Sequence, residues 1–190
     1  GDSSWNEIDT FVKRELGAIK TGGKKIRLVT STINSPSTLA VIADFIAQYP
    51  NTKHITYDAV SYTGIIQANQ NSFGKAVIPH YNFDKADVIV SFGADFLGTW
   101  ISPSEFMGQW VKNRGSKSLA GKKMSRHIQF ETGMSLTGSN ADTRILIKPS
   151  EEGLALVNLY NAVSGTTLPG SKPMGNSSAD KAVKLVAAEL

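Results

Sequence analysis

Cysteine is absent from the 190 residues of this sequence. Its absence excludes disulfides, thiolate nucleophiles, thiolate zinc sites and cysteine-ligated iron–sulfur clusters within the chain. Long apolar runs are absent too, because none approaches the roughly 18 residues that a membrane-spanning helix needs. The segment from Gly1 to Trp5 has neither the basic nor the apolar part of a secretory signal. We therefore expect no direct membrane insertion, and we favour an excised piece of a longer protein over a complete cytosolic one.

Several motifs that mark common enzymes are also missing. The sequence contains no G-x-G-x-x-G and no Walker A pattern, which disfavours standard binding of NAD or ATP. It contains no G-x-S-x-G elbow and no H-E-x-x-H, and it has no recognisable pair of catalytic acids. His54, His80 and His127 lie far apart in the sequence, so a metal site would need the fold to gather them; we expect none and assign no catalytic residue.

Acidic residues are missing from one stretch of the sequence, although the net charge of the chain is only +4. The cations of this stretch are Lys112, Arg114, Lys117, Lys122, Lys123 and Arg126. Charge runs are usually solvated surface, so a basic loop is the first interpretation and an anion or partner site is the alternative. No aromatic residues alternate with these cations as they do in single-stranded nucleic-acid sites, so we expect no nucleic-acid partner.

Short apolar runs alternate with segments of helical periodicity along most of the chain. The predicted strands cover residues 26–30, 53–57, 87–92, 126–130 and 144–148. The predicted helices cover residues 6–16, 36–49, 62–73, 103–114 and 151–163, with Ser35, Ser102 and Ser150 as caps for the second, fourth and fifth. This alternation predicts an α/β fold with a doubly wound, mainly parallel sheet of about five strands and helices on both faces, a Rossmann-like arrangement. Residues 1–163 would form this domain, and residues 164–190 a linker and a C-terminal helix.

Ligands of open parallel sheets bind beyond the carboxyl ends of the strands, so the loops there are the candidate site. Asp58 and Glu131 each end a predicted strand, and each could accept bonds from ligand hydroxyls or simply cap a loop. Gly93 follows the most apolar strand and would allow close backbone approach, with Asp95 in reach of a ribose or a base. The aromatic residues of the following segment are expected to be core and interface rather than a cofactor box: Phe96, Trp100, Phe106 and Trp110.

The order of these strand-end segments resembles that of the molybdopterin oxidoreductase superfamily. The matching pieces are an Ala-Asp-Val-Ile strand running to Asp95, a Ser-Pro helix start at Ser102, and a strand ending in Glu131. They continue with a turn at 135–142 and a strand that closes on a proline at 145–149.

The amino-acid sequence of residues 91–100 and 134–142 is similar to that of one branch of the superfamily. This branch is the fused molybdopterin-oxidoreductase-like and iron–sulfur subunit of alternative complex III, a bacterial quinol:cytochrome c oxidoreductase. The resemblance implies that the α/β fold is kept without the molybdenum cofactor, and that the iron–sulfur clusters lie in other parts of the parent chain.

Five residues of this sequence stand at positions that contact the cofactor in the family. Gly93 and Asp95 match its G-x-N turn, Glu131 matches the aspartate of its D-P-R, and Thr137 and Asp142 lie in its T-A-x-x-A-D turn.

Two departures from the family pattern point to a degenerate cofactor site. Asp95 places a charge where the family has an amide, and Thr132 and Gly133 replace a proline and a cation that could offset phosphate.

The resemblance predicts a cofactor-less scaffold in an electron-transport complex, itself not catalytic, on the periplasmic side of a bacterial inner membrane. Its partners would be other domains of the parent chain and subunits of the membrane complex. The alternatives are a working oxidoreductase domain that binds a molybdopterin guanine dinucleotide, and a free-standing nucleotide-binding domain that uses Asp58 as a ribose acceptor.

Overall fold

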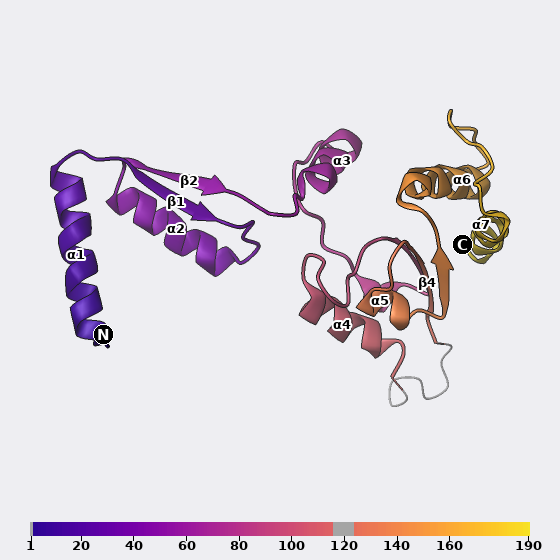
Figure 1. Cartoon of the computed structure of the whole chain (residues 1–190), viewed down its shortest axis with the longest axis horizontal. Helices are drawn as coiled ribbons and strands as arrows, with labels where there is room; N and C mark the ends of the chain where they lie inside the picture. Colours follow the sequence, from indigo (N-terminus) through magenta and orange to yellow (C-terminus); the bar gives the residue numbers. More distant parts are fainter. Residues whose placement is uncertain (1, 116–123) are drawn as a thin grey trace. The chain divides into compact units, whose positions relative to one another are not determined.

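The computed structural model describes residues 2–115 and 124–190 and has an α/β architecture (Figure 1). The chain divides into two compact units, Gly1–Pro79 and His80–Leu190. Each unit contains its own parallel sheet.

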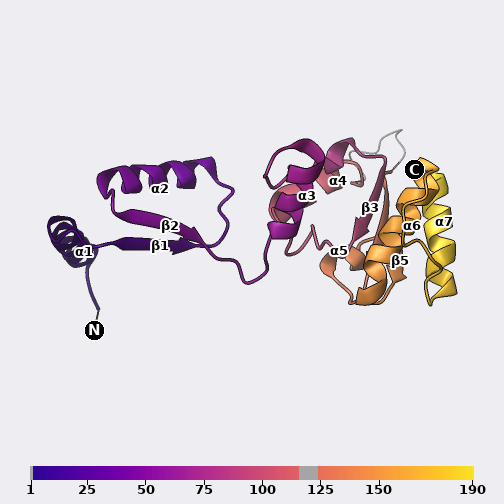
Figure 2. The same ribbon diagram turned by 90° about the horizontal axis from the view of Figure 1, so that it is seen from above.

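The N-terminal unit is built around two parallel strands. Its elements are α1 (Trp5–Thr21), β1 (Ile26–Thr30), α2 (Pro36–Gln48), β2 (Thr52–Thr56) and α3 (Thr63–Phe73). The register of β1 and β2 runs from Ile26 opposite Thr52 to Thr30 opposite Thr56. Helix α2 lies along one face of this sheet (Figure 2).

Local sequence signals explain where these helices begin and end. Ser4 and Glu7 form a capping box at the start of α1. Ser35 caps α2 through the Thr38 amide at 3.3 Å, as the sequence predicts. Gly74 ends α3 with a φ of 70°, a left-handed conformation that glycine adopts without steric cost.

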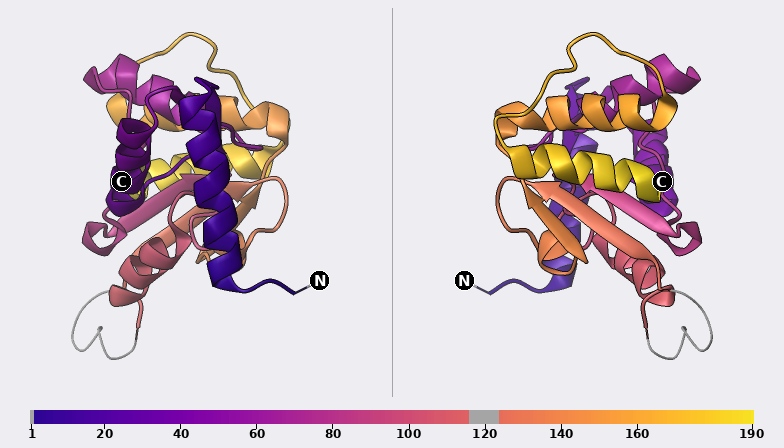
Figure 3. Two further views of the ribbon diagram at one scale, coloured as in Figure 1. Left: turned by 90° about the vertical axis from the view of Figure 1, so that its left-hand side faces the viewer. Right: turned by 90° about the vertical axis from the view of Figure 1, so that its right-hand side faces the viewer.

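The C-terminal unit holds a three-stranded parallel sheet in the order β3-β4-β5. Its elements are η1 (Phe83–Lys85), β3 (Val88–Phe92), α4 (Pro103–Lys112), β4 (Arg126–Glu131), α5 (Leu136–Ser139), β5 (Thr143–Leu146), η2 (Pro149–Glu151), α6 (Glu152–Ser164) and α7 (Ser177–Glu189). Helices α6 and α7 lie together on one side of the sheet and α4 on the other (Figure 3).

Two apolar clusters cover the two faces of this sheet, since alternate residues of a strand point to opposite sides. Ile128 and Phe130 of β4 pack with Leu159 of α6 and Val183 of α7. Ile89 of β3 belongs to the second cluster, which also contains Phe96, Leu97 and Phe106 of the segment from β3 to α4. The aromatic residues Phe96 and Phe106 are therefore core, as the sequence predicts.

The α/β class is confirmed, but the prediction of one sheet of about five strands is wrong for the described residues, which form sheets of two and three strands. Periodicity identifies which segments are strands, but it carries no information about which strand edges pair. Consecutive βα units pair in each sheet, while the connection from β2 to β3 contains α3 and η1.

Two predicted caps and one segment differ in detail from the sequence-based interpretation. Ser102 precedes α4 without a side-chain cap bond, and Ser150 lies inside η2 instead of capping α6. Residues 164–190, predicted as linker and helix, include α7, and three side chains of α7 are buried against β4 and α6: Ala179, Val183 and Val186.

No helix of the described residues has the length and apolar character to cross a membrane.

Candidate functional site

Four of the five predicted site residues lie at the carboxyl ends of the strands in the C-terminal unit. Gly93 directly follows β3, Asp95 lies two residues further, Glu131 ends β4, and Thr137 lies in α5. Asp142 lies elsewhere, directly before β5, where its backbone amide donates to the His127 carbonyl near the start of β4. The structure thus gathers Gly93, Asp95, Glu131 and Thr137 and separates Asp142 from them.

Asp95 connects the loop after β3 to α5 through hydrogen bonds. Its Oδ1 accepts from the Thr137 amide at 3.0 Å and from the Thr137 hydroxyl at 2.8 Å. Its Oδ2 accepts from the Thr99 hydroxyl at 3.1 Å. Burial opposes ionisation of this carboxyl, but the bonds from Thr137 and Thr99 outweigh it and hold the pKa of Asp95 below its usual value. Both carboxylate oxygens are thus engaged within the protein.

Glu131 is held in the same way and is only 4% exposed. Its Oε2 accepts from the Ser135 hydroxyl at 2.6 Å, and its Oε1 accepts from Arg144 Nε of β5. Burial again opposes ionisation, whereas Ser135 and Arg144 stabilise the charged form, so the pKa of Glu131 lies below its usual value. The one guanidinium that contacts this carboxylate is therefore part of an internal ion pair.

Three glycines make room for carboxylates of the protein itself. A Cβ on Gly138 would lie 1.9 Å from Glu131 Oε1, and a Cβ on Gly98 would lie 2.2 Å from Asp95 Oδ2. Gly93 has a φ of 61°, and a Cβ there would lie 2.6 Å from Glu152 Oε1. The close approach that glycine allows is used here by side chains of the chain.

This arrangement does not fit a cofactor that carries a pyrophosphate. Phosphate is held by cations and by available N–H groups. At these strand ends the carboxylate of Glu152 lies beside Gly93, that of Asp95 beside Gly98 and that of Glu131 beside Gly138, and the Thr137 amide already donates to Asp95. Carboxylates in a partly buried site repel a phosphate, so these residues do not fit a molybdopterin dinucleotide.

Asp142 forms an ion pair near the amino end of β4. It accepts from Arg114 Nη2 at 2.5 Å, from Arg114 Nη1 at 2.9 Å and from the His127 amide at 2.7 Å. Burial opposes ionisation of Asp142, and the Arg114 bonds outweigh it, so the pKa of Asp142 is lowered. The Arg114 guanidinium also lies 4.5 Å from the centre of the Trp110 ring.

The basic stretch that the sequence predicts as a solvated loop includes two further ion pairs. Lys112 contacts Asp84 at 3.1 Å and Arg126 contacts Glu189 at 3.1 Å. The remaining cations of that stretch, Lys117, Lys122 and Lys123, lie outside the described residues.

His127 and Gln129 form a buried polar pair that the sequence analysis did not single out. Both are fully buried on β4, and neither His127 nitrogen has a hydrogen-bond partner by geometry among the described residues. Burial and then the nearby Arg114 charge lower the pKa of His127 to about 4, so the ring is neutral at pH 7. The alternating sequence from His127 to Phe130 would have placed His127 and Gln129 on one face of the strand.

In the N-terminal unit, Asp58 makes a comparable bond at the end of β2. Its Oδ1 accepts from the Thr32 amide at 2.8 Å and its Oδ2 from the Thr32 hydroxyl at 2.5 Å. The Thr32 hydroxyl and amide both lower the pKa of Asp58. The carboxylate considered above as a ribose acceptor is thus bound to the loop after β1.

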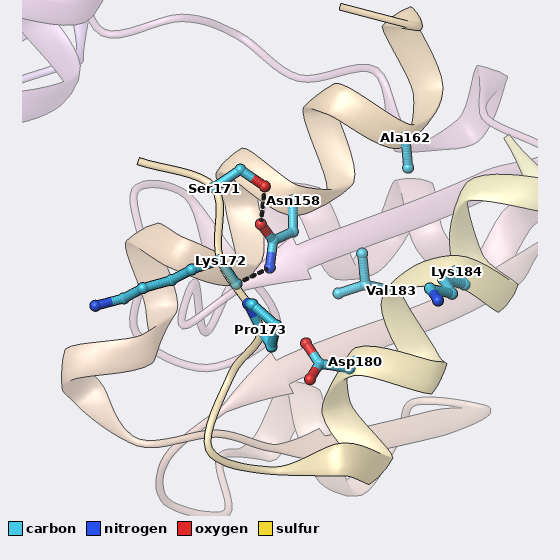
Figure 4. Close-up of a pocket in the computed structure, with 8 residues that line it drawn as sticks. All are labelled: Asn158, Ala162, Ser171, Lys172, Pro173, Asp180, Val183 and Lys184. Atoms are coloured by element: carbon cyan, nitrogen blue, oxygen red, sulfur yellow. Dashed lines mark hydrogen bonds between the residues drawn. The ribbon is translucent and has the colours of Figure 1, made fainter. Parts of the chain in front are cut away.

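The C-terminal unit also has a groove of about 430 Å³ between α6, the segment before α7, and α7 (Figure 4). Asn158 crosses one side, donating to the Lys172 carbonyl at 2.9 Å and accepting from the Ser171 hydroxyl at 2.8 Å. The other lining residues are Ala162, Pro173, Asp180, Val183 and Lys184. None of the four strand-end residues lines it, and the described residues contain no group of three or more potential metal ligands.

Comparison of the sequence with protein-family models gave no match, and neither did comparison with curated proteins.

Proposed function

We propose that this chain is a scaffold domain of a molybdopterin-oxidoreductase-like subunit in a respiratory electron-transfer complex, and that it binds no dinucleotide itself. The observation that carries the proposal is the closure of the strand-end loops by the chain's own groups. Asp95 is bonded to Thr137 and Thr99, and Glu131 to Ser135 and Arg144.

The resemblance in sequence order supplies the class of parent protein, and the geometry supplies the reason for the missing cofactor. A dinucleotide at these strand ends would have to displace the bonds of Asp95 and approach the Glu152 carboxylate beside Gly93. A scaffold needs no ligand at these strand ends. There the hydrogen bonds of Asp95 and Glu131 connect neighbouring segments of the chain. Its partners are the cluster-bearing part of the parent protein and subunits of the membrane complex, on the periplasmic side of the inner membrane.

The cofactor-free part of the proposal is tested by thermal unfolding of the purified chain with GMP, GDP and ADP at millimolar concentrations. A ligand that binds only the folded state stabilises it by RT ln(1 + c/Kd) at a free ligand concentration c, so the midpoint temperature rises as the ligand concentration exceeds Kd. We expect no change with any of the three. A rise of several degrees with a guanine nucleotide would instead support a working dinucleotide site, and a rise with ADP a free-standing nucleotide binder.

The assignment to an electron-transfer complex needs a separate test. An antibody raised against the purified chain should remove quinol:cytochrome c oxidoreductase activity from detergent extracts of the source organism's membranes. The same antibody saturated beforehand with the purified chain is the matched control and should leave the activity in solution. If both preparations leave the activity in solution, the complex is the wrong parent.

A further inference from the structure

One face of the sheet in the N-terminal unit is not covered by any described helix of that unit. Along β1 the half-buried residues Ile26 and Leu28 alternate with exposed residues, so they lie on the covered face of the sheet. On the opposite face Val29 is 60% exposed and Ile55 is 37% exposed, and these two residues are direct partners in the register of β1 and β2. The uncovered face therefore has an apolar centre formed by two β-branched side chains.

Helix α1 has an apolar stripe that contacts no core. Its members recur every three or four residues and so lie along one side of the helix. They are Trp5, Ile8, Val12, Leu16 and Ile19, and none of them is buried. The helix is capped at its N-terminus by Ser4 and at its C-terminus by Gly22. At the C-terminal end of the stripe Ile19 lines a pocket with Ile26 and Tyr49, whereas Trp5, Ile8 and Val12 are 40–80% exposed.

The connection between α1 and β1 has the length found between a helix and a strand that pack together. Four residues, Gly22 to Lys25, separate the two elements, and connections of this kind in α/β units usually have two to six. Gly23 has a φ of 64°, so the bend between the elements lies at a residue that tolerates large backbone changes.

The dimensions and charges of the two surfaces match. If α1 runs antiparallel to β1 from this connection, Val12 lies about 13 Å along the helix and Val29 about 10 Å along the strand. Glu15, whose carboxylate also contacts its neighbour Arg14 at 2.9 Å, borders the apolar stripe of α1, and the uncovered face carries Arg27 and Lys53 as direct partners at its start. An acid on the helix would therefore approach two cations on the sheet.

From these observations we infer that α1 of the same chain closes onto the uncovered face of the β1–β2 sheet, by rotation about Gly22 and Gly23. The closed form places helices on both faces of this sheet. It buries Val29 and Ile55 under the apolar stripe of α1.

The absence of cysteine allows a direct test with single thiols in the full chain. Val29→Cys places a thiol on the uncovered face, and Val41→Cys places a matched thiol on α2, where the valine is 67% exposed. Closure predicts that a disulfide-exchange reagent labels Cys at position 29 several-fold more slowly than Cys at position 41. Equal labelling rates would overturn the inference, provided that the circular dichroism spectra of both variants match that of the parent chain.

A third variant identifies the segment that covers the face. Val12→Glu places a charge in the middle of the α1 stripe, and adding it to Val29→Cys should restore fast labelling. Protection that persists in this variant would mean that another segment is responsible. Protection that disappears on dilution would assign the contact to a second copy of the chain, and either result would overturn the inference.

An oxidative cross-link gives an independent measurement. The pair Val12→Cys with Val29→Cys should form a disulfide within one chain under mild oxidation. The pair Arg14→Cys with Val29→Cys is the control, because residue 14 lies on the opposite side of the helix. Cross-linking of both pairs to the same extent, or only between chains, would contradict closure by the chain's own helix.

Discussion

Both units contain helices and a parallel sheet, but among the residues that the structure describes only those of the C-terminal unit form a buried core. Helices α1, α2 and α3 contain no buried residue, whereas β4 is buried along nearly its whole length. The difference lies in the number of layers, because β4 has a strand on each side and helices over each face. A two-stranded sheet with one uncovered face gives little apolar burial and is marginal by itself.

The strand-end carboxylates show the same contrast at the level of single bonds. Asp58 and Asp95 each accept from both the amide and the hydroxyl of one threonine in a neighbouring segment, Thr32 in the loop after β1 and Thr137 in α5. Thr137, the partner of Asp95, is fully buried, whereas Thr32, the partner of Asp58, is half-exposed. Loss of these hydrogen bonds should therefore lower the free energy of unfolding more in the C-terminal unit. In the N-terminal unit water can replace the lost partner.

The largest expected effect separates the two units. Phe130→Ala removes a fully buried ring from the cluster between β4 and α6 and should lower the free energy of unfolding by about 3–5 kcal/mol. Leu28→Ala removes a half-buried side chain in the N-terminal unit and should cost only about 1 kcal/mol. Urea denaturation followed by circular dichroism measures both. Equal losses would mean that the N-terminal unit has a core of comparable quality.

The next effect depends on pH and on His127. Its pKa falls from 6.5 in the unfolded chain to about 4 in the folded one, so the unfolded state binds the proton first as pH decreases. The contribution of the neutral ring to the free energy of unfolding is present above pH 6.5 and is lost as pH falls toward 4. The loss between pH 7 and pH 5 is about 2 kcal/mol.

His127→Phe keeps the ring shape without a titrating group and should remove that pH dependence. Arg114, Asp142 and Glu131 surround the site, but the lowered pKa values of the two carboxyls place their titration below this range. Urea midpoints of the parent chain and the variant at pH 7 and pH 5 measure the difference. Identical pH profiles would show that His127 is not buried as a neutral ring.

A smaller effect tests whether the strand-end glycines make room for the protein's own acids. Gly138→Ala forces a methyl group against Glu131 and should cost about 1–3 kcal/mol. Gly133→Ala is the matched control, because nothing lies within 4 Å of a Cβ there, and it should be close to neutral. Differential scanning calorimetry distinguishes the two, and a neutral Gly138→Ala would mean that the Glu131 side chain has space to move.

The last prediction compares Asp95 with Asp58, whose carboxylates each accept hydrogen bonds from one threonine. Asp95→Ala leaves the buried Thr137 hydroxyl without its carboxylate partner and should cost about 1–3 kcal/mol. Asp58→Ala should destabilise the chain less, because its partner Thr32 is half-exposed. The pKa values of both aspartates are lowered, so each contribution is present above the unfolded pKa near 3.8 and is lost as pH falls through the folded value. Chemical denaturation at pH 7 measures the loss of unfolding free energy in each variant. A larger loss for Asp58→Ala than for Asp95→Ala would contradict the proposed difference between the units.

Much of the secondary structure could be predicted from the sequence, because each element carries its own local signal. The apolar run from Val88 to Phe92 and the cap at Ser35 are of this kind. The pairing of strands could not be predicted, since it depends on edges that the side-chain pattern does not describe.

The candidate site was predictable only in part. Strand ends identified Gly93, Asp95 and Glu131 as neighbours, because parallel strands end at one edge of the sheet. Asp142 directly precedes the strand predicted at 144–148, which places it at the amino ends of the parallel strands, and only the resemblance grouped it with the other site residues. No sequence pattern could show that Ser135 and Arg144 would occupy the Glu131 carboxylate, because those bonds arise only from packing.

The central claim is that the strand-end groups of the C-terminal unit are used within the protein and hold no nucleotide. Two-dimensional amide spectra of the full chain, titrated with GDP, test it at the atoms concerned. We predict that the amide signals of Gly93, Thr137 and Gly138 stay in place up to millimolar GDP. Saturable shifts of these three signals would contradict the account and would show a working dinucleotide site at the ends of β3 and β4.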